Sequence, residues 1–247
     1  MRQYEAVIKV MEDNGGYATL GHLYQNVFKV RGVKWGTKTP FASIRRIVQD
    51  ERFFFKIEPG LWALKSWRER LPEEMIAVRK KTRRQEVFTH SYYQGLLVQI
   101  GNFKRLGTFV PAQDRNRVFL GKQTLGTLAS VRRMYPFTYP SIVKRAQTID
   151  VVWFNERRLP VSVFEVEHST NMRDSVVKFV ELQDFRVDML IVADGTRQGL
   201  FRKTLEMAAF AGIRDRLRFM SYEQVGDYHA GVSRLHALGR EIGLGRG

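Results

Sequence analysis

The sequence has 247 residues, of which 44% are hydrophobic and 27% are charged, a composition typical of a globular protein with one or two domains. Cysteine is absent, which excludes disulfides and thiolate metal sites, and no apolar run reaches the length of a membrane span. The 41 Lys and Arg residues outnumber the 25 Asp and Glu residues, and the net charge of +16 favours nucleic acid as a partner. The N-terminal residues lack the apolar core of a secretory signal, so we expect a cytoplasmic protein without membrane contact.

The first 65 residues predict three helices followed by a β-hairpin. Apolar residues at helical spacing predict helices at Tyr4–Met11, Leu20–Phe28 and Pro40–Glu51, the last with Thr39 as its N-cap. Two extended apolar segments, Phe53–Ile57 and Leu61–Leu64, flank a Pro-Gly pair that suits a type II turn. Three helices and a hairpin in this order are typical of a winged helix-turn-helix domain.

The element order and the segment KTPFASIRRIVQDERFFFKIEPGLWAL resemble the HARE-type winged helix found beside restriction nucleases and chromatin regulators. This resemblance covers residues 1–65 and implies a DNA-binding role. It places six residues of the third helix and the loop before it near the duplex: Thr37, Lys38, Ser43, Arg45, Arg46 and Gln49. The alternative is that this helix packs against another domain or another protein.

Residues 66–84 form a basic segment between two predicted domains. Lys80 and Lys81 are candidates for contacting phosphates without reading the base sequence. The alternative is that the charges form the solvated face of a helix. The predicted division is therefore a winged helix at 1–65, a basic linker at 66–84 and a second domain at 85–247.

From residue 85 onward the pattern predicts an α/β (α+β) domain, with a mixed sheet flanked by helices. In chain order we expect a helix at Glu86–Leu106, strands at Thr108–Pro111, Ile149–Phe154 and Val161–Val166, a helix at Asn171–Phe185, a strand at Val187–Ala193, a helix at Gln198–Ala211, a strand at Leu217–Ser221 and a helix at Ser221–Leu238. A short helix is also expected at Thr124–Arg132.

Three acidic residues lie in the central hairpin of this domain. Glu165 and Glu167 are two apart in one strand and project from the same face, and strand pairing brings Asp150 to the same end. Carboxylates that converge within apolar strands are costly unless a cation neutralises them, which predicts a divalent metal site. The alternative is that Glu165 and Glu167 lie on the solvated face of a half-exposed strand.

The order helix, three strands, helix, strand resembles the core of the PD-(D/E)xK nuclease superfamily over residues 85–222. Within it, Asp150 and the triplet Glu165-Val166-Glu167 resemble the catalytic motif, in the variant that has glutamate in place of lysine. The resemblance implies Mg²⁺, or Mn²⁺ as a substitute, bound by Asp150, Glu165 and the carbonyl of Val166. Glu86 matches the position of an additional acid that helps to bind metal in many members, although a solvated acid in the first helical turn explains it equally well.

The missing lysine puts a direct transfer of the superfamily mechanism in doubt. Glu167 could bind a second metal or orient the attacking water, but it supplies no positive charge. Lys178, on the next predicted helix, is the nearest substitute, although a solvated helix lysine is the preferred interpretation. His168 could contact phosphate or transfer protons, but a structural role as a helix cap is favoured.

The first hypothesis is a metal-dependent endonuclease of restriction type that acts on double-stranded DNA as a homodimer. The second is a DNA-binding transcriptional regulator whose degenerate nuclease fold does not cut. A third is a nuclease for RNA or DNA junctions. Trp35, Trp62 and Trp153 could stack on bases, although burial in a core is the better interpretation.

Overall fold

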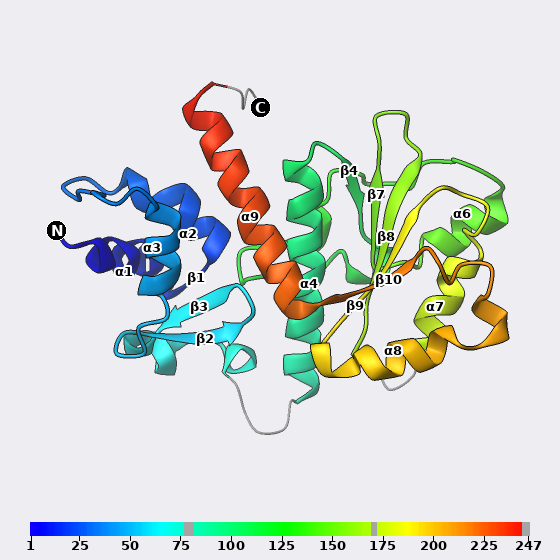
Figure 1. The fold of residues 1–247 in the computed structure, drawn as a ribbon, viewed down its shortest axis with the longest axis horizontal. Helices are drawn as coiled ribbons and strands as arrows, with labels where there is room; N and C mark the ends of the chain where they lie inside the picture. The colour runs from blue at the N-terminus through cyan, green and yellow to red at the C-terminus, as the bar shows by residue number, and fades with distance from the viewer. Residues whose placement is uncertain (77–81, 169–171, 244–247) are drawn as a thin grey trace. The chain divides into compact units, whose positions relative to one another are not determined.

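The computed structural model of the protein describes residues 1–76, 82–168 and 172–243 (Figure 1). The chain forms two compact units, one of Met1–Gln85 with Gly226–Gly247 and one of Glu86–Val225. This division differs from the predicted ranges, because residues 226–247 belong to the same unit as residues 1–85. Lys80 and Lys81, the predicted phosphate contacts of the linker, lie outside the described residues.

The N-terminal unit has the predicted order of three helices followed by a hairpin. Its helices are α1 (Gln3–Asp13), α2 (Leu20–Asn26) and α3 (Pro40–Ile47), with short 3₁₀ turns at η1 (Val27–Lys29), η2 (Lys65–Arg70) and η3 (Glu73–Met75). Its strands β1 (Tyr17–Thr19), β2 (Phe54–Glu58) and β3 (Leu61–Leu64) form an antiparallel sheet of order β1-β3-β2. Gly60 has a φ of +82°, as the predicted Pro-Gly turn requires. Helix α3 ends at Ile47 rather than Glu51, and Thr39 occupies its N-cap without a side-chain hydrogen bond.

The end of the chain completes the core of the N-terminal unit. Ala230 is buried in the same hydrophobic cluster as Leu23, Ile44 and Phe54. Gly21 on α2 makes an especially close approach to this segment, since a Cβ atom there would lie 2.4 Å from the Ser233 Oγ. The C-terminal residues therefore belong to the packing of the N-terminal helices, which sequence patterns did not indicate.

The C-terminal unit is built on a mixed five-stranded sheet. In chain order its elements are α4 (Arg83–Phe103), β4 (Gly107–Phe109), η4 (Ala112–Asp114), β5 (Val118–Phe119), β6 (Gln123–Thr124), α5 (Leu125–Leu128), α6 (Pro140–Ala146), β7 (Val151–Phe154), β8 (Pro160–Val166), α7 (Met172–Val180), β9 (Asp188–Ala193), η5 (Gly195–Arg197), α8 (Gln198–Leu205), η6 (Ala208–Phe210), β10 (Leu217–Ser221) and α9 (Tyr222–Glu241), whose later part lies in the N-terminal unit. The sheet order is β10-β9-β8-β7-β4. Strands β4, β7 and β8 pair antiparallel, whereas β8, β9 and β10 pair parallel, which confirms the predicted mixed sheet.

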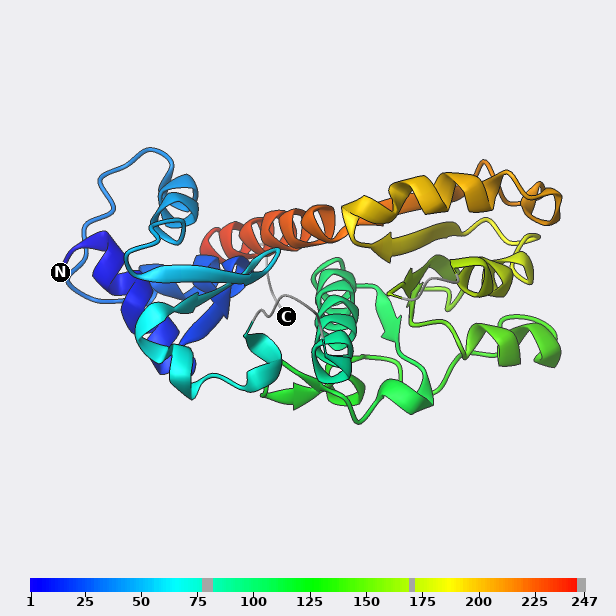
Figure 2. The same cartoon turned by 90° about the horizontal axis from the view of Figure 1, so that it is seen from below.

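Helices cover both faces of this sheet, as Figures 1 and 2 show. On one face the Trp153 indole donates a hydrogen bond to the Leu97 carbonyl of α4, at 3.1 Å. On the other face Val163 of β8 shares a buried cluster with Val176 of α7. Neighbouring residues of a strand face opposite sides of the sheet, and helices cover both sides here. Strand β8 is therefore buried almost throughout.

Several predicted helices are shorter in the structure. Helix α5 ends at Leu128 rather than Arg132, α7 ends at Val180 rather than Phe185, and α8 ends at Leu205 rather than Ala211. Helix α6 was not predicted, because it is a short helix that follows a turn-rich segment, although Pro140 occupies its first turn. In the described part of the chain, no helix has both the length and the apolar character needed to span a membrane.

The close packing of α2 and α9 predicts an unusual response to a helix-favouring substitution. Gly21→Ala places a methyl group 2.4 Å from the Ser233 Oγ and 2.7 Å from the His229 Cε1. In an open helix this change stabilises by about 1 kcal/mol. Here we expect urea unfolding to show a loss of about 1–3 kcal/mol, because the added atom overpacks the interface.

Gly36→Ala is the matched control, since no atom lies within 4 Å of the position of its added Cβ. We expect this variant to stay within about 0.5 kcal/mol of the parent protein. An increase in stability for Gly21→Ala would contradict the packing of the C-terminal segment onto α2.

Candidate active site

The three predicted acids gather at one end of the two central strands. Asp150 directly precedes β7, Glu165 lies in β8 and Glu167 directly follows it. The pairing of Val151 with Phe164 sets Asp150 opposite Glu165. Their exposed fractions are 5% for Asp150, 3% for Glu165 and 6% for Glu167. The alternative that Glu165 and Glu167 decorate a solvated strand face is therefore wrong.

Asp150 and Glu165 each bind the backbone of the other's strand. The Val166 N–H donates to the Asp150 Oδ2 at 2.8 Å, and the Asp150 N–H donates to the Glu165 Oε1 at 3.3 Å. Because the strands are held in register by the sheet, these bonds fix both carboxylates. Val166, whose carbonyl was the predicted metal ligand, thus also supplies an N–H to the site.

Helix α7 brings a cation to this pair of acids. The Lys178 ammonium donates to the two oxygens of Glu165, at 3.0 Å and 2.8 Å, and to the Thr148 carbonyl at 3.1 Å. One turn earlier on the same helix face, the Ser175 hydroxyl donates to Glu167. The preferred interpretation of Lys178 as a solvated helix lysine is wrong, because its head group lies against a buried carboxylate.

The protonation of the two strand acids is coupled. Burial and the neighbouring Asp150 charge raise the pKa of Glu165 well above its usual value, although Lys178 opposes this shift. Burial acts to raise the pKa of Asp150 as well, but His90, Lys178 and the Val166 N–H outweigh it and the pKa is lowered. The pKa of Lys178 is raised, because Glu165 and the other acids outweigh the effect of burial. Without a further cation, Glu165 is therefore the acid that holds a proton most readily.

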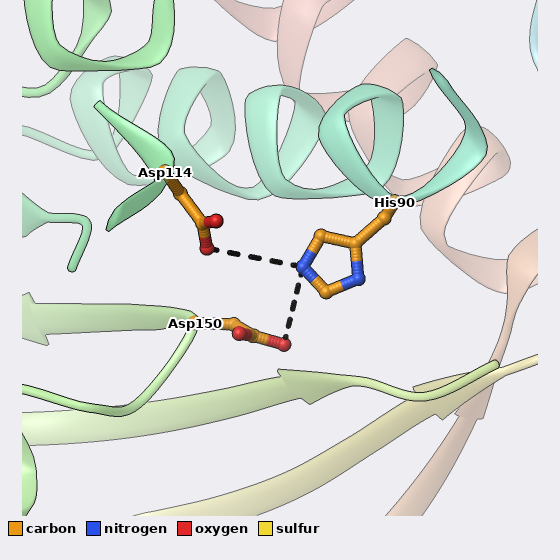
Figure 3. A group of neighbouring side chains, drawn as sticks. All are labelled: His90, Asp114 and Asp150. Carbon is orange, nitrogen blue, oxygen red and sulfur yellow. Dashed lines mark ion pairs between the residues drawn. The ribbon is translucent and has the colours of Figure 1, made fainter. Parts of the chain in front are cut away.

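Two residues that sequence analysis did not identify extend the site toward α4. Figure 3 shows the His90 ring between the carboxylates of Asp114 and Asp150, with its Nε2 4.0 Å from the Asp114 Oδ2 and 3.6 Å from the Asp150 Oδ2. Asp114 ends η4 and is buried. In this group one ligand atom from each residue lies within 4.8 Å of the others, a spacing that could hold a metal ion.

The remaining predicted residues of the C-terminal unit lie at different distances from this group. His168 hydrogen-bonds to the Tyr222 hydroxyl, at 2.9 Å from its Nδ1, and its ring centroid is 5.6 Å from that of His90. Residues 169–171, where a capping role was expected, lie outside the described residues. Glu86 is exposed in the first turn of α4, and within the described residues no hydrogen bond or ion pair joins it to the acids.

The predicted DNA contacts of the N-terminal unit lie on α3 or within a few residues of either end of it. Lys38, Arg45, Arg46 and Gln49 are exposed, and Thr37 and Ser43 are partly exposed. Arg45 forms an ion pair with Asp227 at 2.8 Å. Of the tryptophans considered for base stacking, Trp153 is buried and hydrogen-bonded, whereas Trp35 and Trp62 are partly buried in the N-terminal core.

The fold and site define an α/β protein with a mixed sheet and a buried acidic centre at the end of its middle strands. Residues 70–241, more than half of the chain, match the model of the family described as the type II restriction enzyme NmeDI C-terminal domain. The chain belongs to this restriction enzyme family. Comparison with curated proteins and with solved structures gives no match.

The raised pKa of Glu165 predicts a pH-dependent contribution to stability. Its folded pKa lies above the unfolded value near 4.5, so the folded state binds more protons, and stability is lost as the pH rises from 4.5 through the folded pKa. We expect Glu165→Gln to remove this loss, so that urea unfolding of the metal-free variant changes less between pH 5 and about pH 8 than that of the parent.

Glu181→Gln, an exposed substitution of the same type beyond α7, is the control and is expected to keep the parental pH dependence. A parental pH dependence in Glu165→Gln would show that Glu165 is ionised in the folded protein across this range.

Proposed function

We propose that the protein is a metal-dependent DNA endonuclease of restriction type. Membership of a restriction enzyme family and the net charge of +16 support this proposal. The observation that carries it is the contact between Asp150, Glu165 and Lys178 at the end of the central strands. Phosphodiester hydrolysis requires acids that bind a cation and a positive group near the reacting phosphate, and this arrangement provides both.

The donor set fits a divalent cation. Carboxylate oxygens are the preferred ligands of Mg²⁺, and Mn²⁺ accepts the same donors. Asp150 and Glu165 would hold the cation, with the Val166 carbonyl as the proposed third ligand, whereas Glu86 lies exposed on α4. When bound, such a cation activates water and neutralises negative charge on phosphate oxygens.

Lys178 would take the role of the lysine that the triplet Glu165-Val166-Glu167 lacks. Its ammonium already lies against Glu165, so a small movement of the side chain would allow it to contact a phosphate oxygen. Glu167 accepts a hydrogen bond from Ser175, which anchors the same face of α7. We infer that Glu167 positions the helix that presents Lys178.

The N-terminal unit would hold the DNA as a winged helix. Exposed Lys38, Arg46 and Gln49 lie before, on and just after α3, the helix that a winged helix-turn-helix domain places against the duplex. Arg45 is bound to Asp227 and is therefore less available. Double-stranded DNA is the proposed partner, cleaved by a homodimer in the cytoplasm.

The main test is cleavage of unmodified and modified plasmid and genomic DNA with Mg²⁺ or Mn²⁺, and with EDTA as a blank. We expect the parent protein to cut, and Asp150→Asn, Glu165→Gln and Lys178→Met each to lose at least about 100-fold in rate, because each removes a charged group from the reacting centre. Asp188→Asn, an exposed acid at the start of β9, is the control and is expected to cut at the parental rate.

Cleavage by Asp150→Asn at the parental rate would rule out this site. DNA binding without cleavage under any of these conditions would favour the non-catalytic regulator, which the glutamate at position 167 also favours. Faster cleavage of RNA or four-way junctions than of duplex DNA would instead favour a nuclease for those substrates.

The role of α3 can be tested separately by anisotropy measurements on labelled duplex DNA at several salt concentrations. Arg46→Ala should weaken binding and reduce the slope of log affinity against log salt by about 1, because one phosphate contact is lost. Arg45→Ala should have a smaller effect, since Asp227 already neutralises Arg45.

Lys65→Ala in η2 removes the same charge from an exposed position outside α3 and serves as the control. If Lys65→Ala and Arg46→Ala weaken binding equally, the unit attracts DNA only through its net charge, and α3 has no special role.

A further inference from the structure

We propose that His90, Asp114 and Asp150 form an imidazole–carboxylate metal site that binds Mn²⁺ in preference to Mg²⁺. This inference deepens the proposed function, and it rests on that function only for the use that the cation would serve. Two of the three residues, His90 and Asp114, lie outside the acidic motif of the central hairpin. They come from α4 and η4, so the fold brings three separate segments to one point.

The spacing of the donor atoms suits a cation. The His90 Nε2 is 3.6 Å from the Asp150 Oδ2 and 4.0 Å from the Asp114 Oδ2 (Figure 3). Both separations exceed the length of a hydrogen bond. All three donor atoms lie within 4.8 Å of one another. Adjacent ligands bound at about 2.1 Å to one metal ion are roughly 3.0–3.5 Å apart, so modest side-chain shifts would close the site around a cation.

The Asp114 carboxylate of this group is held in place by neighbouring side chains, whereas the Asp150 carboxylate accepts the Val166 N–H. The Gln94 amide nitrogen donates to the Asp114 Oδ2 at 2.7 Å and to the Asp150 carbonyl at 3.3 Å. The Arg117 Nε lies 2.9 Å from the Asp114 Oδ1. His90 and Gln94 are four residues apart and share one face of α4. Outer contacts of this kind orient the ligands of a metal and raise its affinity.

A second observation is a buried polar atom without a partner beside this group. The Gln94 side chain is fully buried, and its Oε1 has no hydrogen-bond partner within the described structure. Gln94 contacts both carboxylate residues of the group. A buried amide oxygen without a partner costs about 1–3 kcal/mol. A bound cation with its water molecules would offer partners to polar atoms of this group.

The charged side chains nearby favour a cation between His90 and the two aspartates over a cation bound by Glu165 alone. Lys178 already contacts both oxygens of Glu165, so that carboxylate has a cation beside it. Within the described residues, Arg117 forms an ion pair with Asp114 and Lys178 forms one with Glu165, whereas Asp150 has the His90 imidazole beside it at 3.6 Å. A divalent cation beside Asp150 would add positive charge among buried acids.

The imidazole determines which cation is favoured. Imidazole nitrogen is a common ligand of first-row transition metals, and Mn²⁺, the weakest binder of that series, also accepts carboxylates, whereas Mg²⁺ prefers oxygen donors and keeps its own water molecules. A site with one imidazole and two carboxylates therefore selects for the transition metal. Asp150 would bind the cation and also lies beside Glu165, so the cation would lie at the proposed reacting centre.

The test uses the full chain without DNA and Mn²⁺ as the probe. Electron paramagnetic resonance measures the loss of the free Mn²⁺ signal on titration, and pulsed measurements detect ¹⁴N coupling from a coordinated imidazole. We expect one bound Mn²⁺ with ¹⁴N coupling, and at least about a tenfold excess of Mg²⁺ should be needed to displace half of it. Calcium-free buffer with a competing chelator sets the affinity scale.

His90→Ala should abolish the ¹⁴N coupling and weaken Mn²⁺ binding by at least about tenfold. Asp114→Asn provides a second variant, which should weaken binding while the coupling persists at saturating Mn²⁺. His236→Ala, on α9 in the N-terminal unit, is the histidine control and should leave both measurements unchanged. The parent spectrum remains informative even if His90→Ala does not fold.

The proposal is overturned if bound Mn²⁺ in the parent shows no ¹⁴N coupling, if His168→Ala removes the coupling and His90→Ala does not, or if equal Mg²⁺ displaces Mn²⁺. DNA cleavage with Mg²⁺ in the absence of ¹⁴N coupling would remove this site and leave the nuclease proposal intact. Coupled Mn²⁺ in a protein that never cuts nucleic acid would retain the site and remove the nuclease proposal.

Discussion

The burial of Asp150 against Glu165 is the interaction on which the rest of the C-terminal unit depends. Two carboxylates less than one-tenth exposed and set on opposing positions of paired strands cost several kcal/mol in desolvation and repulsion unless other groups compensate. Compensation arrives from both sides of the sheet, because α7 presents Lys178 and α4 presents His90. Removing Glu165 would take away the carboxylate that Lys178 contacts, and removing Asp150 would leave Asp114 as the acid beside His90. The strand pair therefore constrains the placement of both covering helices.

The same arrangement places a lysine at the acidic centre although position 167 is a glutamate. In the sheet, the residue two positions after Glu165 points toward α7, where Glu167 accepts a hydrogen bond from Ser175. Lys178 lies one turn further along that helix and reaches back to Glu165. The positive charge beside Glu165 therefore comes from the helix that faces the strand, at the distance of a direct ion pair. In the proposed function, the bond between Glu167 and Ser175 would hold this helix in the position that the Lys178 contact needs.

Much of the fold could be predicted from the sequence, but only part of the site could be. The apolar runs at 149–154 and 161–166 identified the central hairpin, and the acids within them stood out because buried strands seldom contain charge. The contact of Lys178 depends on how far α7 is rotated over the sheet, which the helical pattern alone does not determine. The role of His90 could not be predicted for a similar reason. A polar residue in a long helix is normally assigned to the solvent-exposed face, and only the packing of the helix on the sheet shows otherwise. Asp114 follows a three-residue strand in a segment without periodicity, and its partners Gln94 and Arg117 lie on either side of it in the chain.

Helix α9 was predicted as an element, yet its contribution to both units was not. Tyr222, in its first turn, stacks on Tyr93 with ring centroids 3.8 Å apart and hydrogen-bonds to His168 beside the acidic centre. Beyond Gly226 the same helix belongs to the N-terminal unit, where Asp227 binds Arg45 and Arg234 lies over the Phe41 ring. The helix proposed to contact DNA is therefore packed against residues from the far end of the chain. Phe41 and Arg45 both belong to α3, so α9 packs against this helix within the N-terminal unit. One continuous element thus contributes side chains both to the proposed DNA-binding unit and to the surroundings of the proposed catalytic centre.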